Sequence, residues 1–287
     1  MAYGTISPNN YIFHGNSLSK NTSQLDLRYF TDMHQAYTTT TVHSEGANFI
    51  LAGANGGGMT VQTPAIHSEF GLTASSGIIG LSTGLTNNTS GNASVYAAQH
   101  IAGIPTPSTG LITKYECETL IEPRSSTGIP DATNNGFFRF GFMDSQNQLS
   151  PANGVYFEYF NDNSTKTDTT WYISFMNSSE ERVNTGVTVT AGKIYRLYLC
   201  VERDTAGNFT TTYNVKNITD NTGAAGTAAP STTARYPSSI SADFMYPAFV
   251  ISKATTGTAT TVTKTVLIDY IGVRIQMPLD REILLLS

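Results

Sequence analysis

The feature that most constrains this chain is a block of alternating aromatic segments within residues 135–201. In Gly136–Met143, phenylalanines recur at every second position, and residues 155–160 and 194–201 alternate in the same way. A period of two in segments rich in aromatic and β-branched residues is typical of β-strands. Several such strands, joined by turns rich in Gly and Asn, need two stacked sheets to bury their apolar faces. We therefore predict an all-β protein built as an antiparallel β-sandwich.

Other segments with this composition are predicted to complete the two sheets. They cover residues 49–51, 69–72, 78–82, 93–97, 111–121, 171–177, 208–215, 246–252 and 264–275. Residues 66–277 are thus expected to form one jelly-roll domain, and residues 278–287 a C-terminal tail. Residues 219–234, which are rich in Thr, Ala and Gly, are predicted to be a long loop.

Residues 1–65 are expected to form an irregular N-terminal arm, because Gly, Pro and Asn are scattered through them. Within the arm, a short helix is predicted over residues 23–37. Ser23 and Asp26 resemble a helix-capping pair, and apolar residues from Leu27 to Tyr37 recur at helical spacing.

Composition excludes several classes of function. The chain has 287 residues, enough for one large β-sandwich, and its net charge is −5. It has no run of Lys and Arg that would indicate a nucleic-acid groove, and no apolar run long enough to cross a membrane. The first ten residues lack the apolar core of a secretory signal. Charged residues make up only 13%, which suits a surface packed against neighbouring proteins.

No pattern in the chain predicts an enzyme. Glu116 and Glu118 share one face of a predicted strand, about 7 Å apart, and are the nearest approach to a pair of catalytic carboxylates. Cys117 and Cys200 lie within strands and are expected to be small buried hydrophobes. The five histidines show no metal-ligand spacing. We therefore name no catalytic residue, no resident metal and no cofactor.

Calcium is the one ion for which loop residues offer suitable oxygen ligands. The candidates are Asp144, Asn147, Asn161, Asp162 and Asp168. Asx side chains in turns more often bond their own backbone, so both interpretations remain open.

The order of the motifs along the chain resembles a known family. GIIGLSTG at residues 77–84, FFRFGFMD at 137–144, NGVYFEYF at 153–160 and TKTVLIDYIGVRI at 263–275 follow one another, with a Trp-bearing strand between the last two. This series resembles the concanavalin A-like, or laminin-G-like, jelly-roll modules of tailed-bacteriophage virion proteins. The resemblance implies an antiparallel two-sheet jelly roll, but that fold hosts many functions.

The first function that the resemblance implies is structural and non-enzymatic. The chain would be a capsid decoration (cement) protein or head-fibre subunit, located in the virion, with the major capsid protein or tail components as partners. Homo-oligomers are expected, and trimers are what the resemblance implies. Residues at the two ends would make the oligomer or virion contacts: Tyr3, Tyr11, Phe13, Leu284, Leu285 and Leu286.

Two alternatives remain open. One is a tail-fibre or baseplate protein that recognises a host surface glycan through loop and aromatic side chains. Its candidate glycan-binding residues are Trp171, Asn134, Asn135, Asp162, Asn163 and Tyr236. Trp171, the only tryptophan, is either a core aromatic or a sugar-stacking platform. The weaker alternative is a polysaccharide depolymerase that uses Glu116 and Glu118.

Overall fold

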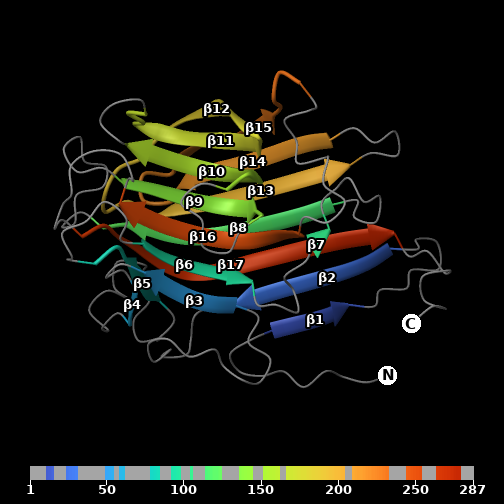
Figure 1. The fold of residues 1–287 in the computed structure, drawn as a ribbon, viewed down its shortest axis with the longest axis horizontal. Coiled ribbons are helices and arrows are strands. Elements are labelled where there is room, and N and C mark those ends of the chain that lie inside the picture. Colours follow the sequence, from blue (N-terminus) through green and yellow to red (C-terminus); the bar gives the residue numbers. More distant parts are fainter. Residues whose placement is uncertain are drawn as a thin grey trace.

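The protein consists of two antiparallel β-sheets stacked face to face (Figure 1). The structure is a computed structural model. It describes residues 11–15, 24–31, 49–54, 58–61, 78–84, 92–97, 104–105, 114–124, 136–144, 151–161, 166–203, 209–232, 244–253 and 263–278. The predicted all-β, two-sheet sandwich is confirmed.

The first sheet has the strand order β1-β2-β17-β8-β13-β14-β15, with β5 paired to β17 and β4 paired to β5. The strands are β1 (Tyr11–Gly15), β2 (Gln24–Thr31), β4 (Gly58–Val61), β5 (Ile79–Ser82), β8 (Lys114–Pro123), β13 (Tyr195–Arg203), β14 (Phe209–Asn217), β15 (Thr222–Ala228) and β17 (Thr265–Pro278). Neighbours that are distant in sequence, such as β2 and β17, make this sheet depend on long-range pairing.

The second sheet has the order β12-β11-β10-β9-β16-β6-β3, with β7 paired to β16. The strands are β3 (Phe49–Ala54), β6 (Asn92–Ala97), β7 (Ile104–Pro105), β9 (Gly136–Met143), β10 (Asn153–Asn161), β11 (Thr170–Asn177), β12 (Ser179–Thr188) and β16 (Phe244–Lys253). Four of these, β9 to β12, follow one another as successive neighbours.

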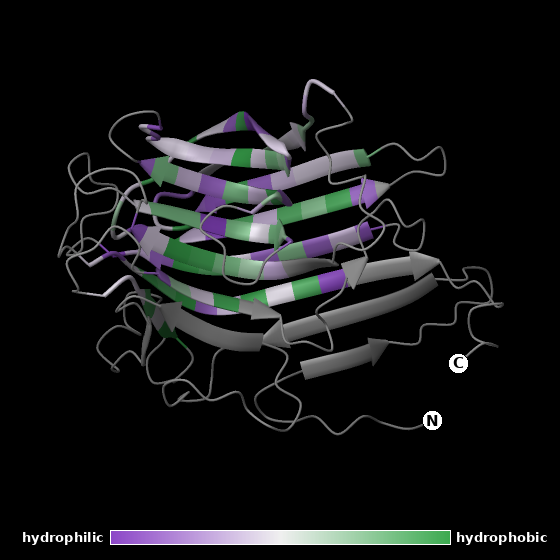
Figure 2. Ribbon diagram, viewed as in Figure 1, coloured by the Kyte–Doolittle hydropathy of each residue, from purple (hydrophilic) through white to green (hydrophobic). Residues whose placement is uncertain are grey.

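The core lies between the sheets, where the alternating aromatic positions meet. Phe142 of β9 packs edge-on against Tyr115 of β8, with ring centroids 4.4 Å apart. Trp171 of β11 packs edge-on against Tyr195 of β13, at 6.0 Å. Figure 2 shows apolar positions recurring along the central strands. Burial of each large apolar side chain stabilises the fold by roughly 1.5–3 kcal/mol.

The outward face of the second sheet also buries apolar side chains. Phe137, Met143, Tyr156, Ala248 and Val250 form a separate cluster there, apart from the core between the sheets. The centre of this face is therefore shielded from water, unlike the outward face of a sheet that is open to solvent. Polar groups placed on it need partners within the protein.

The predicted helix over residues 23–37 is wrong where the structure describes it. Residues 24–31 form strand β2, and residues 32–37 lie outside the described part. The backbone of β2 pairs with β1 on one side and β17 on the other, and this sheet pairing prevails over the helical spacing of apolar residues. Residues 1–65, expected to be an irregular arm, also supply β1, β3 and β4.

The predicted loop over residues 219–234 contains a strand. Residues 222–228 form β15, which pairs in register with β14 through a tight hairpin. Asn221 takes the left-handed backbone conformation that this turn requires, with φ of 53°. The small residues of β15 give no periodic signal, so pairing with β14 rather than intrinsic preference makes this strand.

Two smaller expectations concern cysteines and the membrane. Cys117 and Cys200 are both buried and unbonded to each other, as predicted, and burial raises the pKa of each thiol. Within the described ranges, no helix has the length and apolar character needed to span a bilayer.

Candidate functional site

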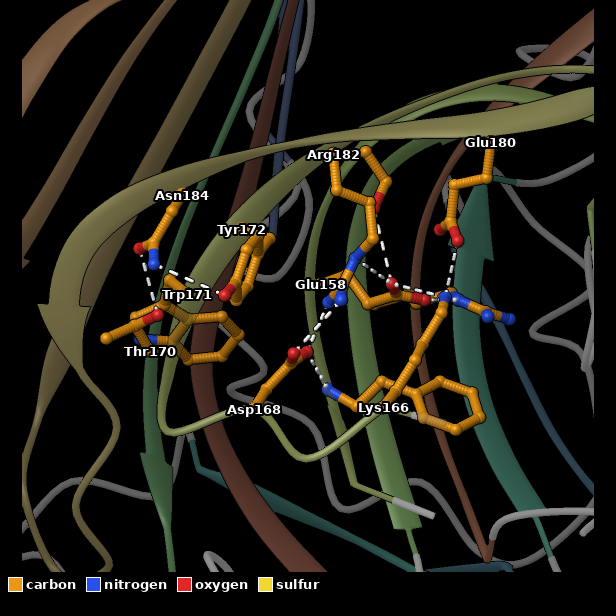
Figure 3. Close-up of polar contacts among 12 residues, drawn as sticks. Glu158, Lys166, Asp168, Thr170, Trp171, Tyr172, Glu180, Arg182 and Asn184 are labelled. Atoms are coloured by element: carbon orange, nitrogen blue, oxygen red, sulfur yellow. Dashed lines mark hydrogen bonds and ion pairs between the residues drawn. The ribbon is translucent and has the colours of Figure 1, made fainter. Parts of the chain in front are cut away.

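A dense group of charged and polar side chains lies on the outward face of the second sheet (Figure 3). Strand register places it: Glu158 of β10 lies opposite Arg139 of β9 on one side and Tyr172 of β11 on the other. Tyr172 in turn lies opposite Asn184 of β12. Cross-strand neighbours on one face have Cβ atoms about 5 Å apart, so these side chains meet.

Glu158 is the centre of this group, and its side chain is fully buried. Arg139 Nε donates to its Oε1 at 2.8 Å, and Lys166 Nζ donates to its Oε2 at 3.1 Å. Arg182 Nε forms an ion pair with the same Oε2 at 2.9 Å. Burial alone would raise the pKa of Glu158, but these three cations lower the pKa to about 2. The carboxylate is therefore firmly ionised at neutral pH.

Two further acids complete the charge balance of the group. Asp168 accepts two hydrogen bonds from the Arg182 guanidinium and one from the backbone N–H of Phe160, at 2.8 Å. Glu180 accepts from Lys166 Nζ. Burial and the neighbouring Glu158 carboxylate raise the pKa of Glu180, although Lys166 opposes this. The three cations thus face three carboxylates, and we call these six residues the ion network: Arg139, Lys166, Arg182, Glu158, Asp168 and Glu180.

Aromatic rings fix the buried end of the ion network. The Arg139 guanidinium lies 4.3 Å from the centroid of the Phe137 ring and 5.7 Å from that of Phe160. The two phenylalanine rings stack on each other at 5.2 Å. Cation–π contacts of this kind are strongest where water is excluded, and Arg139 is only 3% exposed.

The outer end of the group is accessible to solvent, and we call Thr170, Tyr172 and Asn184 the rim. Thr170 Oγ1 donates to Asn184 Oδ1 at 2.9 Å, and Asn184 Nδ2 donates to the Tyr172 hydroxyl at 3.2 Å. The backbone N–H of Gly186 also donates to Asn184 Oδ1, at 2.7 Å. Arg182 lies over the Tyr172 ring, 4.1 Å from its centroid. The rim is therefore a rigid set of polar groups, anchored from beneath by the ion network.

The rim keeps hydrogen-bonding capacity for a ligand. The Tyr172 hydroxyl accepts from Asn184, and among the described residues no group accepts its proton. Asn184 Nδ2 has two hydrogens, of which one is used within the rim. A tyrosine O–H and an amide N–H thus lie side by side on the half-exposed edge of the sheet.

None of the glycan-binding residues predicted from the sequence is among the three residues of the rim. Trp171 is 0% exposed and its ring contacts Phe138, Tyr159 and Tyr195, so the core interpretation is correct and the sugar platform is wrong. The other five lie outside the described residues: Asn134, Asn135, Asp162, Asn163 and Tyr236.

The predicted oligomer contacts remain predictions. Tyr11 and Phe13 lie in β1, but their side chains are outside the description. The remaining four residues of that set lie outside the described ranges altogether: Tyr3, Leu284, Leu285 and Leu286.

The calcium candidates that the structure describes are held by protein partners. Asp144 Oδ2 accepts from the backbone N–H and the Nδ2 of Asn153, at 2.9 and 3.1 Å. Asp168 is bound to Arg182. Asn161 is a buried residue of β10, and Asn147 and Asp162 are not described. In the described part of the chain, no three His, Cys, Asp or Glu residues form a group that could hold a metal ion.

Glu116 and Glu118 lie on the outward face of the first sheet, far from the ion network in the fold. Glu116 accepts hydrogen bonds from the Tyr198 hydroxyl and from Arg274 Nη1. Glu118 accepts one from the Tyr270 hydroxyl. Each carboxylate is thus bound by its own tyrosine, and Arg274 also holds Glu116.

Sequence reasoning did not identify the ion network. Arg139 and Glu158 were visible as charged residues at the outward positions of otherwise aromatic strands. That was the available signal, because charged groups inside such strands are rarely left unpaired. Their partners Arg182 and Glu180 follow only from the register of β10, β11 and β12, and Lys166 lies in the connection between β10 and β11.

Comparisons with known proteins identify the fold. No family model matches the chain, and no curated protein sequence matches it. Among solved structures, basic winged bean lectin with Tn-antigen matches with a TM-score of 0.55 at 13% identity, over 88% of this chain and 99% of that one. Winged bean acidic lectin with methyl-α-D-galactose matches with 0.51 at 10% identity, over 88% and 99%. Arcelin-5, a lectin-like defense protein from Phaseolus vulgaris, matches with 0.50 at 9% identity, over the same shares.

These similarities confirm the predicted concanavalin A-like jelly roll. At such low identity they show the fold alone. The resemblance to phage virion modules gains no support from them.

Proposed function

We propose that this chain is a lectin-like protein that binds a neutral glycan at the rim, without cleaving it. The observation that carries the proposal is the rigid arrangement of Thr170, Asn184 and Tyr172, with donor groups still available at the exposed edge. Pre-positioned polar groups lose little conformational entropy when a ligand binds. Sugar hydroxyls accept and donate hydrogen bonds at the spacing that such groups offer.

The charge balance of the ion network favours a neutral sugar. Each cation near the rim is already paired with a carboxylate, so no positive charge is left for a uronate or sulfate group. Arg182, the cation nearest the Tyr172 ring, is bound to both Asp168 and Glu158. An acidic polysaccharide would have to break these pairs in order to bind.

The same network argues against catalysis. A general acid or base works best with a pKa near the operating pH and within reach of the substrate. Glu158 has its pKa lowered to about 2 and is fully buried. The proposal is supported by fold as well, because two matched lectins carry a sugar, the Tn-antigen or methyl-α-D-galactose, in their structures.

The place of action that we propose is the surface of a tailed-phage virion. This rests on the sequence resemblance alone. There, glycan binding corresponds to a tail-fibre or baseplate receptor-binding protein. Capsid decoration is the second candidate, favoured by the low charge content of 13%. The number of copies per virion distinguishes the two roles. Capsid decoration requires copies arranged in register with the capsid lattice, whereas receptor binding requires only a few copies at the tail.

Screening on an array of neutral and acidic glycans tests the proposed function. We expect a neutral glycan to bind, and Tyr172→Phe and Asn184→Ala each to weaken that binding by about tenfold, the equivalent of one hydrogen bond. The matched control is Tyr270→Phe, which removes a hydroxyl from the outward face of the other sheet. It should bind as the unmodified protein does.

Three outcomes would overturn the proposal. The first is that acidic glycans alone bind. The second is that the rim variants and the control bind equally well. The third is that the bound glycan is released as shorter products, which chromatography of the reaction mixture would detect.

A further inference from the structure

Two edge strands lie along one side of the sandwich, and they differ in composition. β12 ends the second sheet and β15 ends the first, and the two contact each other (Figure 1). β12 carries Glu180, Glu181 and Arg182. β15 reads TGAAGTA and has no charge and no proline.

An exposed edge strand without charge is open to pairing with another strand. Natural proteins protect sheet edges with lysines, other charges, prolines or covering segments, because the unpaired backbone groups would otherwise pair with another chain. β12 has such protection. Five of the seven residues of β15 are exposed, so no segment covers their side chains.

The strand is also held rigidly in place. In the hairpin before it, Asn217 Nδ2 donates to Asp220 Oδ2 at 3.0 Å, and the Asp220 N–H donates to Asn217 Oδ1 at 3.0 Å. Lys193 Nζ bonds Asp220 Oδ1 at 2.7 Å from the neighbouring turn. Gly223 lies so close to β14 that a Cβ would overlap the Val215 carbonyl oxygen. The edge therefore offers a fixed backbone template, which lowers the entropy cost of pairing.

We propose that β15 pairs antiparallel with β15 of a second copy of this chain, about a two-fold axis at Ala225. If the two-fold axis is perpendicular to the sheet, the outward faces of the two copies lie on the same side of the joined sheet. Outward residues of one β15 then lie opposite outward residues of the other, and inward residues opposite inward ones. Ala225 then lies opposite Ala225 of the second copy, Ala224 opposite Gly226, Gly223 opposite Thr227, and Thr222 opposite Ala228.

This register brings no charge and no bulky side chain into contact. A second copy is the fitting occupant, because the partner edge must be as small and uncharged as β15, and the chain itself supplies such an edge. The contact is isologous, so it closes at two copies and joins the two first sheets into one continuous sheet. The edge of the second sheet that contacts β15 is the charged strand β12, which stays out of the pairing.

The test is sedimentation velocity on the full chain with Ala225→Lys. Because Ala225 lies on the axis, this change places two ammonium groups directly opposite each other, where like charges are destabilising. We expect the unmodified protein to sediment with the mass of two chains and the variant with that of one. Thr210→Lys is the control, because Thr210 is exposed on β14 but precedes the residues that pair with β15. It should sediment with the mass of two chains.

A charge-swap experiment guards against misfolding as the explanation. Ala225→Glu alone should also sediment as one chain, and an equal mixture of the Lys and Glu variants should recover the mass of two. A single-chain mass for the unmodified protein at its highest soluble concentration would overturn the proposal. So would a trimer, a dimer that Ala225→Lys leaves intact, or capture of a different protein by β15 in place of the second copy.

Discussion

Glu158 and Glu118 lie on the outward faces of the two sheets, and their surroundings differ. On the second sheet, Glu158 is fully buried and bound to three cations. On the first sheet, Glu118 keeps 33% of its side chain exposed and is bound by Tyr270, with Arg196 at 3.9 Å. Both faces pair acids with basic or phenolic groups, but Glu158 is removed from water and Glu118 is not.

The difference shows where electrostatics decides structure in this fold. Burying charges is costly, so a buried network persists only when every member is paired, and removing one member leaves the others uncompensated. Solvent-exposed pairs contribute little, because water and salt screen them. The second sheet therefore has a rigid outward face that can hold the rim in one geometry.

The largest expected effect comes from removing the central acid. Glu158→Gln should lower the free energy of unfolding by about 3–5 kcal/mol, because it leaves three buried or half-buried cations without their shared partner. The matched change Glu118→Gln on the first sheet should cost less than about 1 kcal/mol. Urea denaturation of both variants measures the two values. Equal losses of unfolding free energy in the two variants would show that the two acids do not differ in this way.

Acid should reproduce part of this loss in the unmodified protein. The pKa of Glu158 is lowered in the folded state, so its stabilisation is complete above the ordinary pKa of about 4.3 and is lost as the pH falls towards 2. We expect it to account for about 3 kcal/mol of the decrease between pH 5 and pH 2. Glu180, whose raised pKa acts in the opposite direction, reduces the net decrease.

Comparison with Glu158→Gln isolates this contribution. That variant should show a shallower decrease in urea midpoint over the same pH range. Parallel pH curves for the two proteins would show that Glu158 is not the titrating group.

A steric change beneath the buried face should have a smaller effect. Gly141 has φ of +150°, and a Cβ there would lie 2.6 Å from Tyr156 Cα and from the Val155 carbonyl oxygen. Gly141→Ala should therefore cost about 2–3 kcal/mol through strain and overpacking. Gly186→Ala, which meets no atom within 4 Å but has φ of +75°, should cost about 1 kcal/mol. Thermal unfolding of the two variants measures the difference between their costs. Similar costs would show that the backbone of β10 moves at Tyr156 to make room for the added methyl group.

The smallest effect is expected from the hydroxyl deletions used to test binding. Tyr172→Phe and Tyr270→Phe each remove a half-exposed hydrogen bond and should change the free energy of unfolding by no more than about 1 kcal/mol. Thermal unfolding of both variants checks this. A larger loss for Tyr172→Phe would mean that the rim supports the fold, and its weaker glycan binding could then not be assigned to direct contact.

The sequence was most informative where alternation and burial coincide. The predicted faces of Gly136–Met143 match the structure, with Phe138, Phe140 and Phe142 in the core and Arg139 outward. Local pattern suffices there because β9 to β12 are neighbours both in sequence and in the sheet.

The predictions that failed share one cause. They concern strands that pair with segments distant in sequence, or strands whose own residues carry no periodic pattern. β2 has as its neighbours β1 and β17, and the pairing with β17 spans most of the chain. β15 consists of residues with little strand preference and exists through its pairing with β14. The ion network likewise depends on strand register, which single-residue periodicity does not specify.

The position of β17 has a consequence for synthesis of the chain. β17 lies between β2 and β8 in the first sheet, although it spans residues 265–278. While the ribosome is still producing the chain, β1 and β2 have no route into this sheet, and the edge of β8 is unpaired. The first sheet can therefore close only once residue 278 has emerged, and the exposed strand edges before then are where chaperones would be needed.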